Sequence, residues 1–226
     1  MNRLLAASLS ETSFLWRSLM SAAPWAVYIS LGFLLGSIHF SYLLPKLLLR
    51  RDICKLSDDH NPGAANVFTH CGAWMGLLCL SFDMAKGLVP VFLAARALEV
   101  ESLPFALVML APVLGHALGV FRHFQGGKCI ATAFGDLLGL IPYSFAVLIL
   151  AATYIAFSTL LKINSHRRRS IMAFLVFGTV ACALLVIRGR FSLALGCAAI
   201  ATTAIIRHLP STTNEAPVEA AQQLRP

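Results

Sequence analysis

The sequence has little charge. Only 12% of its 226 residues are Asp, Glu, Lys or Arg, while 58% are hydrophobic. A soluble fold needs many more polar groups on its surface, so this composition excludes an ordinary globular domain and favours a protein that resides in a bilayer. Acidic residues are the scarcer charge, ten against eighteen Lys and Arg, which leaves a formal net charge of +8.

Patterns typical of metal or nucleic-acid binding are also missing. The six cysteines are scattered, and the loop that holds Cys54, His60, His70 and Cys71 has no C-x-x-C spacing. No basic stripe alternates with exposed aromatic residues. We therefore expect no metal, no other cofactor and no nucleic-acid partner.

Apolar runs dominate what is present. Seven of them approach or exceed the length needed to cross about 30 Å of hydrocarbon. They cover 25–49, 73–98, 103–121, 130–141, 143–161, 171–187 and 191–206, of which the fourth is short and meets the fifth at Pro142. We predict an all-α, polytopic integral membrane protein with about seven transmembrane helices, give or take one, over 21–209. A surface segment over 1–20 and a disordered polar tail over 210–226 complete the chain.

Loop charges predict the orientation. If the N-terminus is outside, the cytoplasmic loops hold ten Lys and Arg and the opposite loops hold five. The ten are Arg50, Arg51, Lys55, Arg122, Lys128, Lys162, Arg167, Arg168, Arg169 and Arg207; the five are Arg3, Arg17, Arg96, Arg188 and Arg190. The positive-inside rule therefore predicts an outside N-terminus and a cytoplasmic C-terminus, with basic loops facing anionic lipid headgroups.

Ionisable residues inside the apolar runs need an explanation. Asp83 and Lys86 would each cost on the order of 3 kcal/mol in hydrocarbon if unpaired. Their i, i+3 spacing puts them on one helix face, where they can pair. Either the pair fixes helix packing or it lines a polar cavity. His116 admits the same two interpretations, a hydrogen-bonded core histidine or a site residue.

A glycine-rich turn precedes the fourth apolar run. Gly126, Gly127 and Lys128 stand directly before it. Free backbone N–H groups, the helix dipole and the lysine would therefore converge on one anion. The spacing differs from that of a nucleotide P-loop, because Cys129 follows Lys128.

The polar loop after the first apolar run is too long for a bare turn. Asp59 and its neighbours can move protons, while Asn61, Gly63 and Asn66 supply turn geometry and side-chain amides. We expect this loop to fold back as a cap over a site on the cytoplasmic side.

Taken together, these segments resemble the motifs of the bacterial acyl-phosphate-dependent glycerol-3-phosphate acyltransferases, the PlsY family. The likeness covers most of the chain. The matches are Gly36, Ser37, Ile38 and Phe40 with GSIPF, His39 replacing proline; Asp52 and Ile53 with DIR; Asn61, Gly63, Ala64, Asn66 and Val67 with SGNxGATNV; Asp83, Lys86 and Gly87 with DxxKG; Gly115 and His116 with GH; Phe124, Gly126, Gly127, Lys128, Ala131, Thr132 and Gly135 with FKGGKGVATxxG; and Arg207 and His208 with the start of RHRxNI.

The resemblance implies an enzyme of the bacterial inner membrane. It would transfer a fatty acyl group from acyl phosphate to glycerol 3-phosphate, giving lysophosphatidic acid and phosphate, with membrane lipids as surroundings. The implied catalytic residues are Asn61, Lys128 and His208, and at the position of the family's serine we expect Asp59 to act as general base or orienter. The implied substrate-binding residues are Ser37, Gly63, Asn66, Gly126, Gly127, Asp83, Lys86 and His116.

Several positions depart from these motifs. Asp59 replaces a serine, three cations are replaced by Cys54, Thr69 and Gln125, and the other departures are Ala65, Cys129 and Ser211. Fewer cations and an added carboxylate weaken anion binding unless Arg50, Arg51, Lys55 or the cluster at Arg167 compensates, or unless the substrate has changed. The alternatives are a non-catalytic relative that binds phospholipid or another phosphate-bearing lipid, and a small-solute transporter.

Overall fold

The computed structural model describes residues 22–141 and 143–209. The segments predicted at 1–20 and 210–226 lie outside these residues. The described part is helical and contains no strand, so the predicted all-α class is confirmed. A helix over Ala22–Ser37 is followed by α2 (Phe40–Leu49), α3 (Ile53–Leu56), α4 (Ala64–Cys71), α5 (Ala73–Ala97), α6 (Phe105–Leu118), the 3-10 turn η1 (Val120–Arg122), α7 (Ile130–Gly139), α8 (Ala146–Ile155), the π-helical turn η2 (Ala156–Leu160), α9 (His166–Ile187) and α10 (Phe191–Ile206).

Not every apolar run forms a helix of full membrane length. By length and composition, α5, α9 and the helix over Phe105–Arg122 can cross a bilayer. The helix over Ala22–Ser37 and α2, which are bent relative to each other, count as a fourth span if they cross together. The shorter apolar helices are α7, α8 with η2, and α10. The 10 residues of α7 rise only about 15 Å, half of the hydrocarbon thickness.

The first apolar run is bent by a tertiary contact. Its two helices, over Ala22–Ser37 and α2, differ in direction by 45°. Asp83 of α5 accepts hydrogen bonds from the backbone N–H of Phe40 at 3.3 Å and of Ser41 at 3.2 Å. These are free N–H groups at the start of α2, where a carboxylate is favoured. A residue of another helix thus caps α2 and fixes the bend.

Glycines let the first helix and α6 pack backbone to backbone. A Cβ at Gly36 would collide with the carbonyl of Pro112, and a Cβ at Gly115 would collide with the carbonyl of Phe33. Only small residues allow this approach. The contact holds the bend after Ser37 beside the end of α6.

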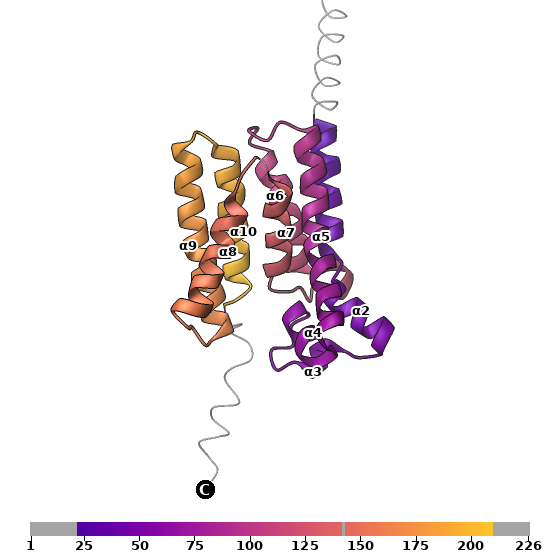
Figure 1. Cartoon of the computed structure of the whole chain (residues 1–226). Coiled ribbons are helices and arrows are strands. Elements are labelled where there is room, and N and C mark those ends of the chain that lie inside the picture. Colours follow the sequence, from indigo (N-terminus) through magenta and orange to yellow (C-terminus); the bar gives the residue numbers. More distant parts are fainter. Residues whose placement is uncertain (1–21, 142, 210–226) are drawn as a thin grey trace, which may run out of the picture.

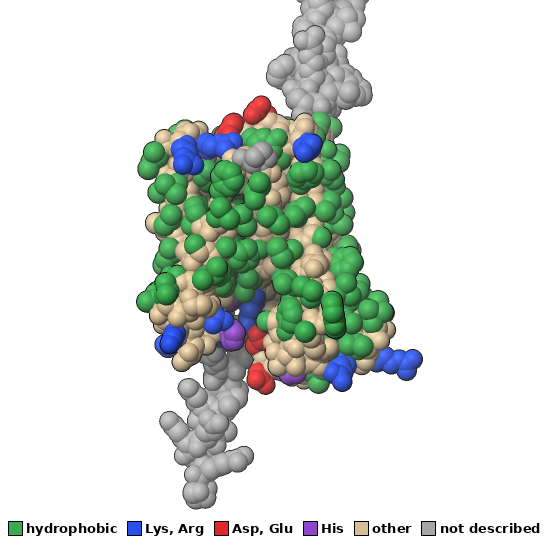
Figure 2. All heavy atoms as spheres, in the orientation of Figure 1, with side chains coloured by type: hydrophobic (Ala, Val, Ile, Leu, Met, Phe, Trp, Pro, Cys, Tyr) green, Lys and Arg blue, Asp and Glu red, His purple; other side chains and the backbone are tan. Residues whose placement is uncertain are grey.

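The helices form two groups that share one core (Figure 1). In that view α8, α9 and α10 stand together, α5, α6 and α7 stand beside them, and α3 and α4 lie under the end of α5. Contacts between α6 and α10 join the groups, and Phe105, Phe174 and Phe177 are fully buried in the core. Figure 2 shows hydrophobic side chains around the middle of the molecule and charged ones at its two ends, as a bilayer requires.

Candidate active site

The loop between η1 and α7 packs tightly on the end of α6. A Cβ at Gly126 would collide with the carbonyl of Ala117, and a Cβ at Gly127 would collide with the imidazole of His116. The N–H of Gly127 donates to the His116 carbonyl at 3.0 Å. These two positions therefore need glycine because of the space available, and the loop holds Lys128 at the start of α7.

Arg207, just after α10, fixes the peptide planes of this loop. Its guanidinium donates to the carbonyl oxygens of Gly127 at 3.1 Å and Gly126 at 2.8 Å. A planar fork of donors suits two consecutive carbonyls. The sequence indicates only a loop charge and part of the RH match at Arg207, and carries no sign of its contact with Gly126 and Gly127.

Arg122 joins three segments of the same end. It donates to the Gln125 carbonyl at 2.7 Å and to the Cys54 sulfur at 3.2 Å, and it lies over the Tyr42 ring at 4.2 Å. The sequence indicated only a loop charge here. Arg122 links α2, α3 and the glycine loop, so it supports the shape of the site.

Lys128 reaches across to the polar loop before α4. Its ammonium lies 2.6 Å from Oδ2 of Asp59, whose Oδ1 accepts from the Asn66 side chain at 2.8 Å and from the Asn61 N–H at 3.2 Å. The Asn66 amide also donates to the Asn61 carbonyl at 2.8 Å. At Gly63 a Cβ would lie 2.6 Å from the Asn61 amide. The structure thus brings together Asp59, Asn61, Asn66 and Lys128, residues from separate motifs.

The Asp59 carboxyl is held in its charged form. Partial burial raises its pKa, but the hydrogen bonds from Lys128 and Asn66 and the charge of Lys128 outweigh burial, so the net pKa lies below the usual value. A carboxylate with a lowered pKa is a weak base. The orienting role considered for Asp59 fits this environment better than general base catalysis.

His208, beside Arg207, is buried with one ring nitrogen engaged. Its Nδ1 lies 2.7 Å from the Ala204 carbonyl, and because a carbonyl can only accept, Nδ1 carries the proton and Nε2 keeps a lone pair. Burial lowers its pKa first, and the nearby charges of Lys128, Arg207 and Arg167 lower it further against the opposing hydrogen bond. His208 is therefore neutral and able to accept a proton near neutral pH.

A buried network lies beneath the glycine loop. The Lys86 ammonium contacts the Asp83 carboxylate at 2.8 Å, the His116 Nδ1 at 2.8 Å and the Ile38 carbonyl at 2.5 Å. Three acceptors use its three N–H donors. Ser37, fully buried, donates to the Phe33 carbonyl at 2.8 Å. Ser37, Asp83, Lys86 and His116 therefore bond to the protein itself and do not face the open side of the site.

His39 connects this network to the glycine loop. Its ring stacks on that of His116 with centroids 4.4 Å apart. Its Nε2 lies 3.1 Å from the His116 carbonyl, the same oxygen that Gly127 binds, and its Nδ1 lies 3.0 Å from the Ser37 carbonyl. The sequence showed only a histidine at a motif's proline position, which carries no sign of this stacking.

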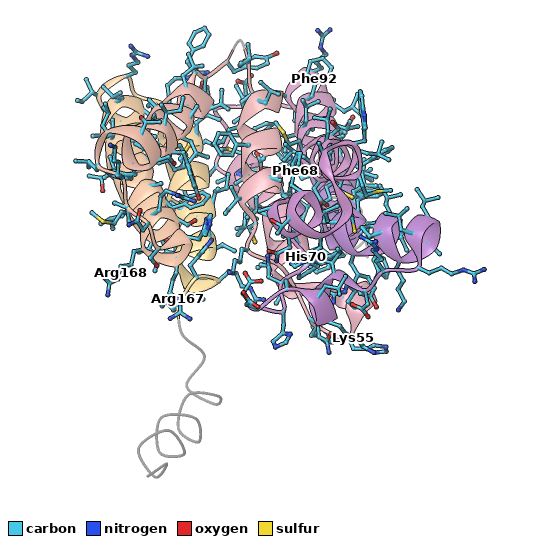
Figure 3. The ribbon with its side chains drawn as sticks, turned by 60° about the horizontal axis from the view of Figure 1, so that its bottom comes forward. Lys55, Phe68, His70, Phe92, Arg167 and Arg168 are labelled. Atoms are coloured by element: carbon cyan, nitrogen blue, oxygen red, sulfur yellow. The ribbon has the colours of Figure 1, made fainter. Side chains whose placement is uncertain are left out.

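The site opens at one end of the molecule. Figure 2 shows acidic, basic and histidine side chains around a hollow at the lower edge, between the two helix groups. Figure 3, turned toward this end, places Arg167 and Arg168 on one side and Lys55 and His70 on the other. Within 22–141 and 143–209, no three His, Cys, Asp or Glu side chains are grouped so that they could hold a metal ion.

Comparisons with known proteins agree with one another. Residues 26–214 match the family model described as glycerol-3-phosphate acyltransferase. Proteins of that name match from Pseudoalteromonas translucida (36% identity over 59% of this chain and 68% of the relative), Pseudomonas aeruginosa (41% over 58% and 67%) and Myxococcus xanthus (39% over 61% and 70%).

Two crystal structures of PlsY, an integral membrane glycerol 3-phosphate acyltransferase, also match. The lysophosphatidic acid form has a TM-score of 0.68 and 28% identity, and covers 81% of this chain and 87% of that one. The glycerol 3-phosphate form has a TM-score of 0.69 and the same identity, and covers 81% and 88%.

Proposed function

Because the chain belongs to the glycerol-3-phosphate acyltransferase family, we infer that it is a membrane enzyme that acylates glycerol 3-phosphate to lysophosphatidic acid. We take acyl phosphate as the donor. The glycerol hydroxyl oxygen forms a bond to the acyl carbon, the bond from that carbon to the phosphate oxygen breaks, and phosphate leaves with the electron pair. The convergence of Lys128 with Asn61 and Asn66, seen in the 2.6 Å contact of Lys128 with Asp59, is the observation that carries this proposal.

Lys128 would bind one phosphate through its charge. Asn61, Gly63 and Asn66 would form the adjoining wall, while Gly126 and Gly127 bring the backbone close. Charge-assisted hydrogen bonds of this kind are the stronger ones in a partly dehydrated site. Arg207 would keep the loop in this shape through its two carbonyl contacts.

His208 would take the hydroxyl proton on Nε2, because its Nδ1 is engaged by a carbonyl. Asp59 would orient Lys128 and Asn66. Asp83, Lys86, His116 and Ser37 would act on substrate indirectly, by holding the loop above them.

The acyl chain would lie among the helices. An apolar groove of about 360 Å³ runs between the first helix and α6, and Phe33, Leu107 and Leu114 are among its lining residues. Its end at Leu114 is two residues from His116. An acyl chain bound in this groove would place the phosphate of acyl phosphate toward the end of the molecule that holds Lys128.

We propose seven passes through a bacterial inner membrane, with an outside N-terminus and the site at the cytoplasmic face. The seven passes would be the bent pair, α5, α6, α7, α8, α9 and α10, of which α7 is the short one. The excess of Lys and Arg on the loops at the site's end supports this orientation. The opposite end carries the Arg190–Glu101 ion pair.

The direct test uses purified protein, palmitoyl phosphate and labelled glycerol 3-phosphate. We expect labelled lysophosphatidate, and Lys128→Ala should lower the rate on the order of 100-fold. A parallel reaction with palmitoyl-CoA tests the donor. No product under conditions in which the Pseudomonas aeruginosa relative is active would favour the non-catalytic, lipid-binding alternative.

A further inference from the structure

The site already contains an anion of its own. The Asp59 carboxylate accepts hydrogen bonds from one charged and two neutral donors. Lys128 lies 2.6 Å from Oδ2. Oδ1 accepts from the Asn66 side chain at 2.8 Å and from the Asn61 N–H at 3.2 Å. These are groups that a phosphate oxygen would use. The side chains of Lys128 and Asp59 are 30% and 41% exposed, so a ligand can reach the pair.

The two oxygens of this carboxylate are held differently. Oδ1 is fixed by its own loop, through Asn61 and Asn66, whereas the bond from Oδ2 runs to Lys128 on another segment. When Lys128 turns to a phosphate, Asp59 therefore keeps its place and Oδ2 faces the incoming group. A fully ionised phosphate there meets a like charge, whereas a phosphate with one P–OH can donate a hydrogen bond to Oδ2.

Two of the surrounding cations, Arg122 and Arg207, do not remove this conflict. Lys128 is one cation shared between two anions. Arg122 on the adjoining segment is bonded to Cys54 and Gln125, and Arg207 is bonded to the carbonyls of the glycine loop. Burial chiefly raises the pKa of Cys54, and the negative charge of Asp59 raises it further. Cys54 is therefore a neutral thiol. The nearby His208 is neutral as well, with a lowered pKa.

The acceptor's phosphate is the one that fits beside Asp59. In acyl transfer the leaving phosphate gains negative charge, so a carboxylate next to it would oppose the reaction. The phosphate of glycerol 3-phosphate keeps its charge throughout. Placing it at Lys128 and Asp59 avoids that cost.

We propose that Asp59 is a specificity-determining residue, which makes the acceptor site take glycerol 3-phosphate with a singly protonated phosphate in preference to the dianion. This proposal rests on the function proposed above. Phosphate monoesters lose their second proton near pH 6, so about half carry it at pH 6 and about 1% at pH 8. In the free site burial raises the Asp59 pKa, but the bonds from Lys128 and Asn66 outweigh burial and hold the pKa below its usual value, so the carboxylate is charged when the ligand arrives.

The experiment compares the Michaelis constant for glycerol 3-phosphate at pH 6 and pH 8, with palmitoyl phosphate saturating. For the unaltered protein we expect a rise of about tenfold or more between these values, which follows from the loss of the protonated phosphate. Asp59→Asn keeps the shape and removes the charge, so its rise should be less than about threefold. Asp58→Asn, at the exposed neighbouring carboxylate, is the matched control and should behave like the unaltered protein.

Three readouts keep the outcomes apart. The Michaelis constant for palmitoyl phosphate should show the same pH dependence in all variants, and Asp59→Ser repeats the test if Asp59→Asn does not fold. Lysophosphatidate formation with an unchanged pH ratio in Asp59→Asn and Asp59→Ser overturns the proposal while leaving the acyltransferase function intact. Absence of product from the unaltered protein at both pH values instead overturns that function.

Discussion

His208 is buried directly after α10 and is bonded through Nδ1 to the Ala204 carbonyl. Burial and the neighbouring cations both disfavour its charged form, so its pKa lies below the ordinary 6.5. A lowered histidine pKa extends the neutral, proton-accepting form to lower pH. If His208 is the base, its environment therefore sets the pH below which the enzyme should lose activity.

We expect kcat, measured from pH 5 to 8 with both substrates saturating, to fall with acid only below about pH 6.5. His208→Gln should lower kcat by about 100-fold or more, since general base catalysis contributes on that scale. His123→Asn is the control, because His123 has a left-handed φ of 51° that asparagine tolerates. An acid limb that persists unchanged in His208→Gln would rule out this role.

Single residues differ in how far their type reveals their contacts. Lys128, Asn61 and Asn66 could be placed in the candidate site from glycine spacing, turn residues and motif order. Arg207 and His39 could not. A cation after an apolar helix looks like any positive-inside anchor. The Nε2 contact of His39 is with the His116 carbonyl at the end of α6, 77 residues away in the chain. The sequence groups Asp59 and Lys128 in one candidate site, but it does not reveal that the two side chains form an ion pair.

At the scale of elements, Asp83 performs two tasks. It caps α2 through the N–H groups of Phe40 and Ser41, and it pairs with the buried Lys86. Lys86 in turn bonds to Ile38 in the bend and His116 of α6. The Asp83–Lys86 pair therefore joins α2, α5 and α6. Of the two interpretations open from the sequence, helix packing is the one these contacts support.

Asp83→Asn tests this joint. It removes the charge that compensates a buried ammonium, so we expect a loss of about 3–5 kcal/mol in unfolding free energy. The Ser41 hydroxyl also donates to this carboxylate, so Ser41→Ala removes that one hydrogen bond while keeping the backbone N–H bond, and should cost only about 1 kcal/mol. Thermal or denaturant unfolding of both variants in one detergent makes the comparison. Equal and small losses of unfolding free energy in the two variants would contradict the proposed role of Asp83 in holding these helices together.

The helices themselves were predictable to different degrees. The apolar run over 191–206 coincides with α10, and the run over 73–98 with α5 to within one residue. Run length cannot reveal the bend before α2, since the cap comes from Asp83 on another helix. The start of α9 at His166, five residues before the apolar run, follows from the Ser165 side chain, which caps the N–H of Arg168. Capping residues are polar, so the pattern of hydropathy along the sequence does not reveal them.

For the whole molecule, the distribution of charge separates two ends. The far end holds Arg190, which bonds to Glu101 at 2.7 Å and also to the Tyr143 carbonyl. The other end holds the site, with Lys128, Arg207 and the start of α9. Composition predicted the membrane class, because 12% charged residues cannot cover a soluble surface. The length of the run over 130–141 already indicates a short element, but composition does not reveal that α7 packs against α5.

The orientation can be tested with a membrane-impermeant maleimide. Glu99 and Asp58 are both exposed. Glu99 follows the far end of α5, whereas Asp58 lies between α3 and α4, which are at the opposite end of that helix (Figure 1). With Cys54 and Cys71 replaced by serine, Glu99→Cys should be labelled in intact spheroplasts and Asp58→Cys only in inverted vesicles. The reason is the excess of Lys and Arg on the loops at the site's end, which the positive-inside rule keeps in the cytoplasm. The remaining cysteines lie within helices or directly before α7, and several are fully buried, so they give a low background. Labelling of Asp58→Cys from outside would place the phosphate-binding end away from cytoplasmic glycerol 3-phosphate, and the proposed reaction would then lack its acceptor.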